Sequence, residues 1–240
     1  MLKLIAHRGA STLALENTKA AFEIAGKSAQ VFGIETDIWK TTDNVWVCSH
    51  DNNPFVDKTI LINQSKYSDI QKLPLSITKP KFNTDQKNYL CTLDDYLDVC
   101  QKFDKAPIIE IKSNDLTNAD CVVLSNKIHK RGLFEKTAFI SFEFDSLKTL
   151  RTAMPKITIY DLIDTKLAKN GLGKSGVKVS INLNHNVSVR SCLATKKIVK
   201  LAHEHHLLIS IWTVDKVRCA HRYKHRDVDF ITTNNINLFT

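Results

Sequence analysis

Short apolar segments rich in β-branched residues alternate with amphipathic patterns along the chain. Short alternating or continuous apolar runs predict strands, whereas apolar residues spaced by about one helical turn predict helices. Eight strands are predicted on this basis: Lys3–His7, Gly33–Trp39, Pro107–Lys112, Ala138–Phe142, Ile157–Leu162, Val177–Leu183, Leu207–Val214 and Val228–Thr232. Strands that alternate with helices are typical of a parallel sheet built from βα units.

Helical patterns fill most of the gaps between these strands. The predicted helices are Asn17–Lys27, Thr92–Phe103, Ala119–Arg131, Phe144–Met154 and Ser191–His205. Thr18 and Thr92 are suited to cap helices, because their hydroxyls can accept a hydrogen bond from a free backbone N–H. Eight strands with intervening helices predict a (β/α)8 TIM barrel, a fold of about 250 residues. A doubly wound open sheet is the structural alternative.

Two segments depart from the repeat. Val45–His50 is strand-like but follows the strand that ends at Trp39 after only a short turn, so it must return antiparallel as a hairpin. Asn52–Tyr89 is polar, contains three prolines and has little periodicity. We interpret it as an insertion at about residues 52–90 that covers one end of the sheet. The prediction is therefore a single domain over residues 1–240, with a small insertion after the second strand and its hairpin.

The composition is that of a folded globular protein, with 43% hydrophobic and 25% charged residues. No apolar run approaches the roughly 18 residues of a membrane span, and the first apolar segment is too short for a signal-peptide core. The six cysteines are scattered without a C-x-x-C pair, as expected of reduced thiols. We therefore expect a cytoplasmic protein without stable membrane insertion. The oligomeric state is left open.

The formal net charge of +9 favours anionic partners, namely phosphate esters, nucleic acid or anionic membrane surfaces. The basic residues are dispersed, and they lack the interleaved aromatic residues of single-strand binders. We expect no nucleic-acid partner, which leaves a small anionic molecule as the favoured ligand.

Carboxylates stand within two of the apolar strands. Glu35 and Asp37 are two positions apart, so both point to one face of the strand, as Glu110 and Lys112 do on the next. Paired carboxylate oxygens suit a hard divalent cation. An acid within an apolar strand is costly to bury without a partner. Each pattern alone is also consistent with a solvated strand end, and their joint occurrence is more informative.

Two histidines stand where strands end. His7 and Arg8 close the first strand, and His50 closes the predicted hairpin over the same end of the sheet. A histidine pair could supply a general acid and a general base. Taken alone, each histidine is more often an ordinary polar residue.

Six short motifs, in order along nearly the whole chain, resemble the glycerophosphodiester phosphodiesterase family. They are HRGA at His7–Ala10, ENT at Glu16–Thr18, ETD at Glu35–Asp37, SHD at Ser49–Asp51, EIK at Glu110–Lys112 and WTV at Trp212–Val214. The resemblance implies a (β/α)8 barrel that uses calcium or magnesium to cleave deacylated phospholipid diesters to glycerol 3-phosphate and an alcohol.

The same resemblance implies roles for individual residues. Glu35, Asp37 and Glu110 match the ligands of one divalent cation, and His7 and His50 match the acid and the base, in an order that stays open. Arg8 and Lys112 match positions that hold the phosphate. Glu16 is expected to brace Arg8. Trp212 is a candidate wall for the glycerol or the head group, with a core tryptophan as the alternative.

This chain departs from the family pattern at its substrate end. It has Asp215 after WTV, where the family often has Asn, and Asn234 where the family commonly has an acid. The segment Val56–Thr59 lacks the arginine that the family often carries there. These departures leave the substrate preference open.

Three other motifs are set aside. Gly171–Gly176 spells G-x-G-x-x-G but is predicted to open a strand, whereas a dinucleotide site must open a helix. The tract His203–His206 lies at a predicted helix end, where imidazoles interact favourably with the helix dipole. His221 and His225 stand among basic residues that would repel a cation.

The leading hypothesis is a metal-dependent phosphodiesterase that acts on small glycerophosphodiesters, such as glycerophosphocholine or glycerophosphoethanolamine. One alternative keeps the same site but acts on a larger lipid, as a lysophospholipase D or a sphingomyelinase D does. The insertion has no obvious amphipathic face, which favours small substrates. The other alternative is a catalytically silent barrel that binds phosphate or a lipid head group, although a binder would not need the full set of carboxylates and histidines.

Overall fold

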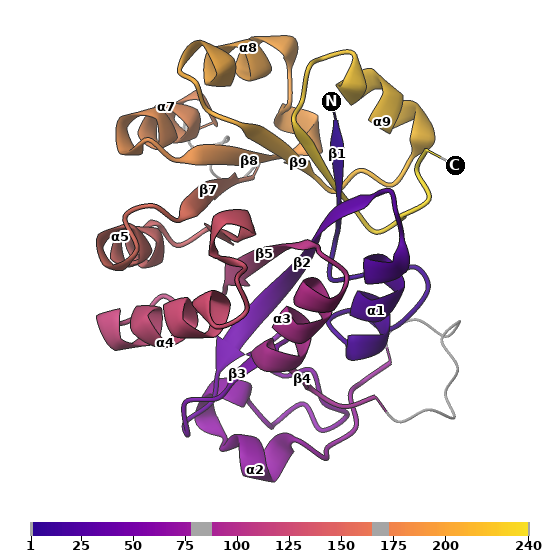
Figure 1. Ribbon diagram of the computed structural model, residues 1–240, viewed down its shortest axis with the longest axis vertical. Helices are drawn as coiled ribbons and strands as arrows, with labels where there is room; N and C mark the ends of the chain where they lie inside the picture. Colours follow the sequence, from indigo (N-terminus) through magenta and orange to yellow (C-terminus); the bar gives the residue numbers. More distant parts are fainter. Residues whose placement is uncertain (1, 78–87, 165–172, 240) are drawn as a thin grey trace.

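The computed structural model of the protein describes residues 2–77, 88–164 and 173–239. Its central feature is a closed barrel of parallel strands, because β1 pairs in parallel with both β2 and β10. The eight barrel strands are β1 (Lys3–Ala6), β2 (Val31–Lys40), β5 (Ala106–Ile111), β6 (Ala138–Ser141), β7 (Thr158–Ile163), β8 (Asn186–Arg190), β9 (Ile209–Trp212) and β10 (Phe230–Thr233). The predicted (β/α)8 barrel is confirmed, and the open sheet is excluded by this closure (Figure 1).

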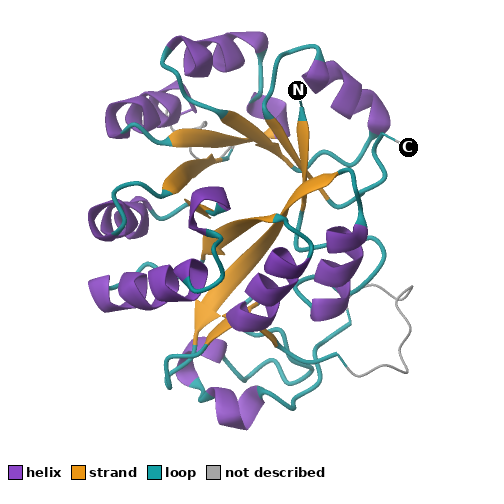
Figure 2. Ribbon diagram, in the orientation of Figure 1, coloured by secondary structure: helices purple, strands orange, loops and turns teal. Residues whose placement is uncertain are grey.

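Helices form a layer outside the strands, as Figure 2 shows. They are α1 (Lys19–Lys27), α3 (Leu93–Lys102), α4 (Asn118–His129), α5 (Phe144–Ala153), α7 (Gly173–Leu183), α8 (Lys196–Glu204) and α9 (Val217–Lys224), with 3-10 turns at Phe134–Lys136 and Ser191–Leu193. Thr18 and Thr92 cap α1 and α3 through their hydroxyls, as expected. Helix α9 was not predicted from the sequence. Among the described residues, no helix combines the length and the apolar composition that a membrane crossing requires.

The predicted strand at Val177–Leu183 is wrong, because this segment belongs to helix α7 and the strand β8 follows it. Its apolar residues alternate, but Val177 and Ile181 are also one helical turn apart. Gly176 lies in α7 against Ile163 of β7, where an added Cβ would reach van der Waals contact at 3.4 Å. Packing against the sheet therefore decided between two periodicities that the local sequence allowed.

This correction changes the context of the glycine motif. The described part of Gly171–Gly176 opens a helix and not the predicted strand, so the predicted strand no longer argues against a dinucleotide site. Gly171 and Leu172 lie outside the described residues, so the structure does not place the motif as a whole.

The hairpin is confirmed and the insertion is better packed than its sequence suggested. Strand β3 (Trp46–Cys48) pairs antiparallel with β2, and β4 (Cys91–Thr92) pairs with β3. Between them lie a 3-10 turn at Ile62–Gln64 and the short helix α2 (Tyr67–Ile70). The buried residues of the insertion, together with flanking side chains, form a cluster of their own: Leu15, Val47, Phe55, Ile62, Ile70, Leu75 and Leu90. Irregularly spaced apolar residues in turns produce no periodic signal, which is why this core was missed.

Buried polar contacts secure the two strands that matter most for the site. Tyr96 of α3 is fully buried, and its hydroxyl donates to the Ile34 carbonyl oxygen at 2.6 Å and accepts from the Ile108 N–H at 3.0 Å. One side chain thus bridges β2 and β5. Each such hydrogen bond contributes about 1 kcal/mol and also fixes the relative position of the strands.

Candidate active site

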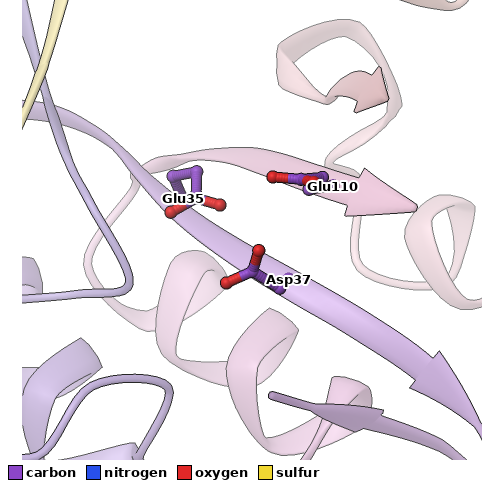
Figure 3. Close-up of side chains that lie close together, drawn as sticks. All are labelled: Glu35, Asp37 and Glu110. Carbon is purple, nitrogen blue, oxygen red and sulfur yellow. The ribbon is translucent and has the colours of Figure 1, made fainter. Parts of the chain in front are cut away.

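Three carboxylates meet near the carboxyl ends of two adjacent strands. Glu35 and Asp37 project from β2 and Glu110 from β5, where Asp37 and Glu110 are register partners (Figure 3). One oxygen from each lies within 4.8 Å of the others, and the three residues are 2%, 0% and 9% exposed. The predicted pairing of carboxylates is therefore present in space, and adjacent parallel strands bring the third member to it.

The two cations beside the acidic cluster, Arg8 and Lys112, compensate the charge of its three carboxylates only in part. Burial, together with the charge of Asp37, raises the pKa of Glu35 well above its ordinary value and that of Glu110 to about 7. Burial would also raise the pKa of Asp37, but Arg8 and Lys112 hold it below its ordinary value. A buried oxygen of Glu35 (Oε1) and one of Asp37 (Oδ1) have no hydrogen-bond partner among the described residues. Three buried carboxylates, two of which have an oxygen that no hydrogen bond satisfies, fit a divalent cation such as calcium or magnesium.

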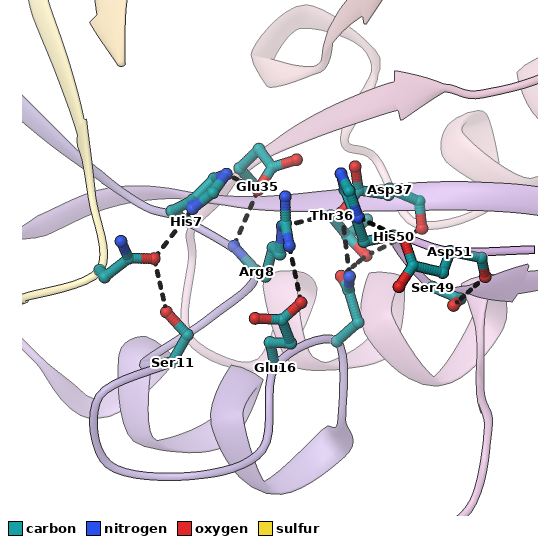
Figure 4. Close-up of polar contacts among 12 residues, drawn as sticks. His7, Arg8, Ser11, Glu16, Glu35, Thr36, Asp37, Ser49, His50 and Asp51 are labelled. Carbon is teal, nitrogen blue, oxygen red and sulfur yellow. Dashed lines mark hydrogen bonds and ion pairs between the residues drawn. The ribbon is translucent and has the colours of Figure 1, made fainter. Parts of the chain in front are cut away.

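Arg8 is held in an uncommon backbone conformation beside this cluster. Its φ is 56°, and its N–H donates to Glu35 Oε2 at 2.8 Å. Its Nη1 donates to Glu16 Oε1 at 2.6 Å, and its Nε lies 3.2 Å from Asp37 Oδ2 (Figure 4). Glu16 thus contacts Arg8 as expected. Gly9 follows with a φ of 79°, and a Cβ there would lie 2.7 Å from the Ala21 backbone, so this turn requires glycine.

Lys112 and Asn17 complete the surroundings of Asp37. Lys112 Nζ donates to Glu110 Oε1 at 2.9 Å and lies 3.4 Å from Asp37 Oδ1. Asn17 donates from Nδ2 to Asp37 Oδ2 at 3.0 Å, and its own Oδ1 accepts from the Thr36 hydroxyl at 2.7 Å. Asn17 was not predicted as a site residue, although its place in the ENT motif was a signal.

The two histidines differ in their surroundings. His7 is largely buried, its Nδ1 lies 2.9 Å from Asn234 Oδ1, and its Nε2 lies 3.9 Å from Glu35 Oε2. Burial and the charge of Arg8 lower the pKa of His7. The His50 side chain is more exposed, and its Nδ1 lies 2.8 Å from Asp51 Oδ1. The contact with Asn234 was not predicted, because the two residues are 227 positions apart.

A cavity of about 160 Å³ opens over this cluster. Its charged half consists of His7, Arg8, Glu35, His50, Glu110 and Lys112. The other half is uncharged and is called the apolar half: it consists of the apolar residues Ile140, Phe142, Leu162 and Trp212 together with Ser188, Thr213 and Thr232. Seven of the eight predicted site residues line the cavity, and Asp37 lies behind it. Trp212 is thus a wall residue, and its ring meets that of Phe142 edge-on with centroids 5.7 Å apart.

The histidine motifs that were set aside lie elsewhere. His203 is in the last turn of α8, and its Nε2 is 3.0 Å from Asp229 Oδ2, just before β10 begins. This places it at the amino end of the barrel, opposite the cavity. His221 lies in α9, where its ring meets Phe239.

Comparison with known proteins gives relatives over most of the chain. The model of the Glycerophosphoryl diester phosphodiesterase family matches residues 7–238. MG293 of Mycoplasma genitalium, an uncharacterized protein, is 32% identical over 150 residues, which span 60% of this chain and 60% of that relative. YhdW of Bacillus subtilis is 26% identical over 238 residues, which span 96% of this chain and 93% of its own.

Solved structures share the fold. A glycerophosphodiester phosphodiesterase from Agrobacterium tumefaciens has a TM-score of 0.81 and 22% identity, with 100% of this chain and 99% of that chain covered. An Oleispira antarctica phosphodiesterase, solved in complex with its product sn-glycerol-3-phosphate, has a TM-score of 0.82 and 18% identity, with 97% and 92% covered. The family match extends from the first histidine of the site to beyond the last barrel strand. The protein therefore belongs to the glycerophosphoryl diester phosphodiesterase family, whose members are enzymes that hydrolyse phosphodiesters.

Proposed function

We propose that the protein hydrolyses glycerophosphodiesters, such as glycerophosphocholine or glycerophosphoethanolamine, to glycerol 3-phosphate and an alcohol. The observation that carries this proposal is the buried cluster of Glu35, Asp37 and Glu110 beside a cavity that two histidines and two cationic side chains also line. In this cluster, one oxygen of Glu35 and one of Asp37 accept no hydrogen bond. The family match and the product seen in the Oleispira antarctica structure support it. We assign this activity to one domain of residues 1–240, with the insertion at about 52–90 beside the site.

The carboxylates would hold one divalent cation, calcium or magnesium. When bound, such a cation supplies positive charge that stabilises the negative charge developing on the phosphoryl oxygens. The remaining positive charges of the site are those of two side chains, Arg8 and Lys112. Arg8 and Lys112 line the cavity and would hold the phosphate, and their pairing with carboxylates keeps both in place before the substrate arrives.

His7 and His50 would move protons in two steps. In the first, one histidine removes the proton of the glycerol hydroxyl next to the phosphate, and the resulting oxygen attacks phosphorus. The other histidine donates a proton to the departing alkoxide, so the alcohol leaves and a cyclic phosphate forms. In the second step, water opens the cyclic phosphate with the proton roles reversed, and glycerol 3-phosphate results.

The apolar half of the cavity would bind the glycerol or the head group. Trp212 and Phe142 present ring surface to the cavity, and the Trp212 Nε1 donates to the Ser188 carbonyl oxygen at 3.2 Å, which fixes the indole. A wall without charge suits a methylene-rich group better than a second phosphate.

One assay separates this proposal from its two alternatives. The purified protein is incubated with glycerophosphocholine, glycerophosphoethanolamine or lysophosphatidylcholine, with calcium, magnesium or a chelator, and glycerol 3-phosphate and choline are measured. Glycerol 3-phosphate from the soluble diesters in the presence of metal supports the proposal. Choline released only from lysophosphatidylcholine indicates the lysophospholipase D alternative, and no turnover with any metal indicates a silent binder.

Variants test the assigned residues in the same assay. H7A and E110A should abolish turnover while circular dichroism and melting temperature show a folded protein. H225A, at an exposed position at the end of α9, is the matched histidine control and should keep the wild-type rate. Full activity in H7A or E110A would refute the site assignment.

A further inference from the structure

A line of polar contacts leads from His7 out of the cavity to two residues without an assigned role. Asn234 follows β10, and Asp215 lies three residues after β9. The Asn234 backbone N–H donates to Asp215 Oδ1 at 2.7 Å, and its side-chain Nδ2 donates to Asp215 Oδ2 at 2.8 Å. On its other side, Asn234 Oδ1 lies 2.8 Å from the Ser11 hydroxyl and 2.9 Å from His7 Nδ1.

These contacts determine how the Asn234 amide is oriented. A carboxylate only accepts hydrogen bonds, so the atom that faces Asp215 Oδ2 must be the NH2 group of Asn234. The amide oxygen then faces His7, as placed. Because an amide oxygen also only accepts, His7 Nδ1 must carry the hydrogen. In the neutral imidazole, the lone pair is therefore on Nε2, the nitrogen on the side of Glu35.

His50 has a different partner. Its Nδ1 lies 2.8 Å from the Asp51 carboxylate, and its side chain is 40% exposed at the cavity. His7 Nδ1 thus faces a neutral amide oxygen, whereas His50 Nδ1 faces a carboxylate, so partners of different charge hold the two imidazoles. The two histidines are therefore equipped for opposite roles.

We propose that Asn234, held by Asp215, is a positioning residue that fixes the Nδ1–H tautomer of His7 and so makes His7 Nε2 the base for the substrate hydroxyl. His50 is then the acid that protonates the leaving alkoxide. This assignment rests on the proposed function for its chemistry, although the tautomer itself does not depend on it. In the family pattern, Asn follows WTV and an acid stands at the position of Asn234. This chain exchanges the two residue types, and because Asp215 and Asn234 contact each other, the pair still contains one carboxylate and one amide.

The tautomer can be measured without substrate. Nitrogen-15 NMR of histidine-labelled protein distinguishes a protonated ring nitrogen from one with a free lone pair, and H7Q identifies the His7 signals by their loss. The wild type should show a protonated Nδ1 and an unprotonated Nε2 in neutral His7, and N234A should show a mixture of tautomers. A neutral His7 protonated at Nε2 in the wild type would overturn the proposal.

Kinetics test the consequence for catalysis. Neither Asn234 nor Asp215 lines the cavity, so N234A should lower kcat by about 10- to 100-fold, as loss of a residue that orients a functional group does, with KM within about twofold. N126A, at an exposed position on α4, is the matched control and should keep both constants.

The exchange variant D215N/N234D provides the rescue. In N234D, two carboxylates face each other, so kcat should fall. In the double variant, a carboxylate at position 234 again accepts from His7 and an amide at position 215 again donates, so the tautomer and most of kcat should return. A double variant that is no better than N234D, or an N234A with wild-type kcat, would overturn the proposal. If the wild type turns over no diester, the proposed function fails, whereas the NMR result still decides the tautomer.

Discussion

The two halves of the cavity are built by opposite halves of the barrel and differ in the charge and polarity of their side chains. The charged half comes from β1, β2, β5 and the hairpin, and its side chains are braced by contacts such as Arg8–Glu16 and Asn17–Asp37. The apolar half comes from β6–β10, and its best-defined polar contact is that of the Trp212 indole with the Ser188 carbonyl. Charged side chains that are already held in place can stabilise charge on the phosphate without moving during the reaction. An apolar surface is better suited to recognising the shape of the head group.

The largest effect is expected in the charged half. E35Q should lower kcat/KM on the order of 10³-fold, since a catalytic cation contributes several kcal/mol. The same variant should melt at a higher temperature than the wild type in a chelator at neutral pH, because it removes a carboxyl whose ionisation is unfavourable, as burial and the charge of Asp37 raise the pKa of Glu35. Activity assays and melting curves with and without calcium or magnesium measure both effects.

A matched variant separates this effect from simple loss of charge. E204Q removes a carboxylate from the exposed face of α8, where Glu204 pairs with Lys200 at 3.6 Å, and should change neither activity nor the metal response. Metal ions should raise the melting temperature of the wild type and of E204Q but much less that of E35Q. Equal stabilisation of all three proteins by metal would place the cation elsewhere.

An intermediate effect is expected in the apolar half. W212A should raise KM about 5- to 30-fold, because about 1 to 2 kcal/mol of apolar contact with the head group is lost, while kcat changes little. W212F should retain most of the affinity, since it keeps an aromatic ring against Phe142. Steady-state kinetics on two diesters with different head groups check this. A fall in kcat with unchanged KM would show that Trp212 acts in the chemical step. The assignment of catalysis to the charged half and of substrate binding to the apolar half would then be wrong.

The smallest effect on activity is expected outside the cavity, at Asp120 of α4. Its carboxylate accepts from Lys40 Nζ at 2.8 and 2.9 Å and from the Thr117 N–H at 3.0 Å, which joins β2 to the start of α4. D120N should lower the free energy of unfolding by about 1 to 2 kcal/mol at pH 7, with activity retained. Denaturant unfolding measures this loss.

The pH dependence of the Asp120 contribution has a definite sign. Burial would raise its pKa, but the bonds from Lys40 and Thr117 hold it below the ordinary value of 3.8. The stabilisation is therefore present above that value and is lost as the pH falls through the lowered pKa. The difference between wild type and D120N should narrow as the pH approaches and passes below 3.8, and a difference that widens there would contradict the ion pair.

Much of the fold was predictable from local patterns. Seven of the eight barrel strands were located, as was the hairpin, because short apolar runs bounded by turns are a strong signal. The strand predicted at Val177–Leu183 was wrong because its apolar spacing fits a strand and a helix equally, and the packing of α7 against β7 and β8 leaves no mark in the local sequence. Helix α9 was missed because basic residues dominate it and leave few apolar positions to show a period.

The sequence by itself determined which residues carry the charge of the candidate site, because an acid within an apolar strand, or a histidine at the end of one, stands out in the sequence pattern. Tertiary structure alone decided how those residues act on one another. The cluster of Glu35, Asp37 and Glu110 arises only when β2 and β5 lie side by side, and the orientation of His7 depends on Asn234, which closure of the barrel brings beside it. Hydrogen bonds and burial depend on distance in space, and barrel closure joins positions that no local pattern connects.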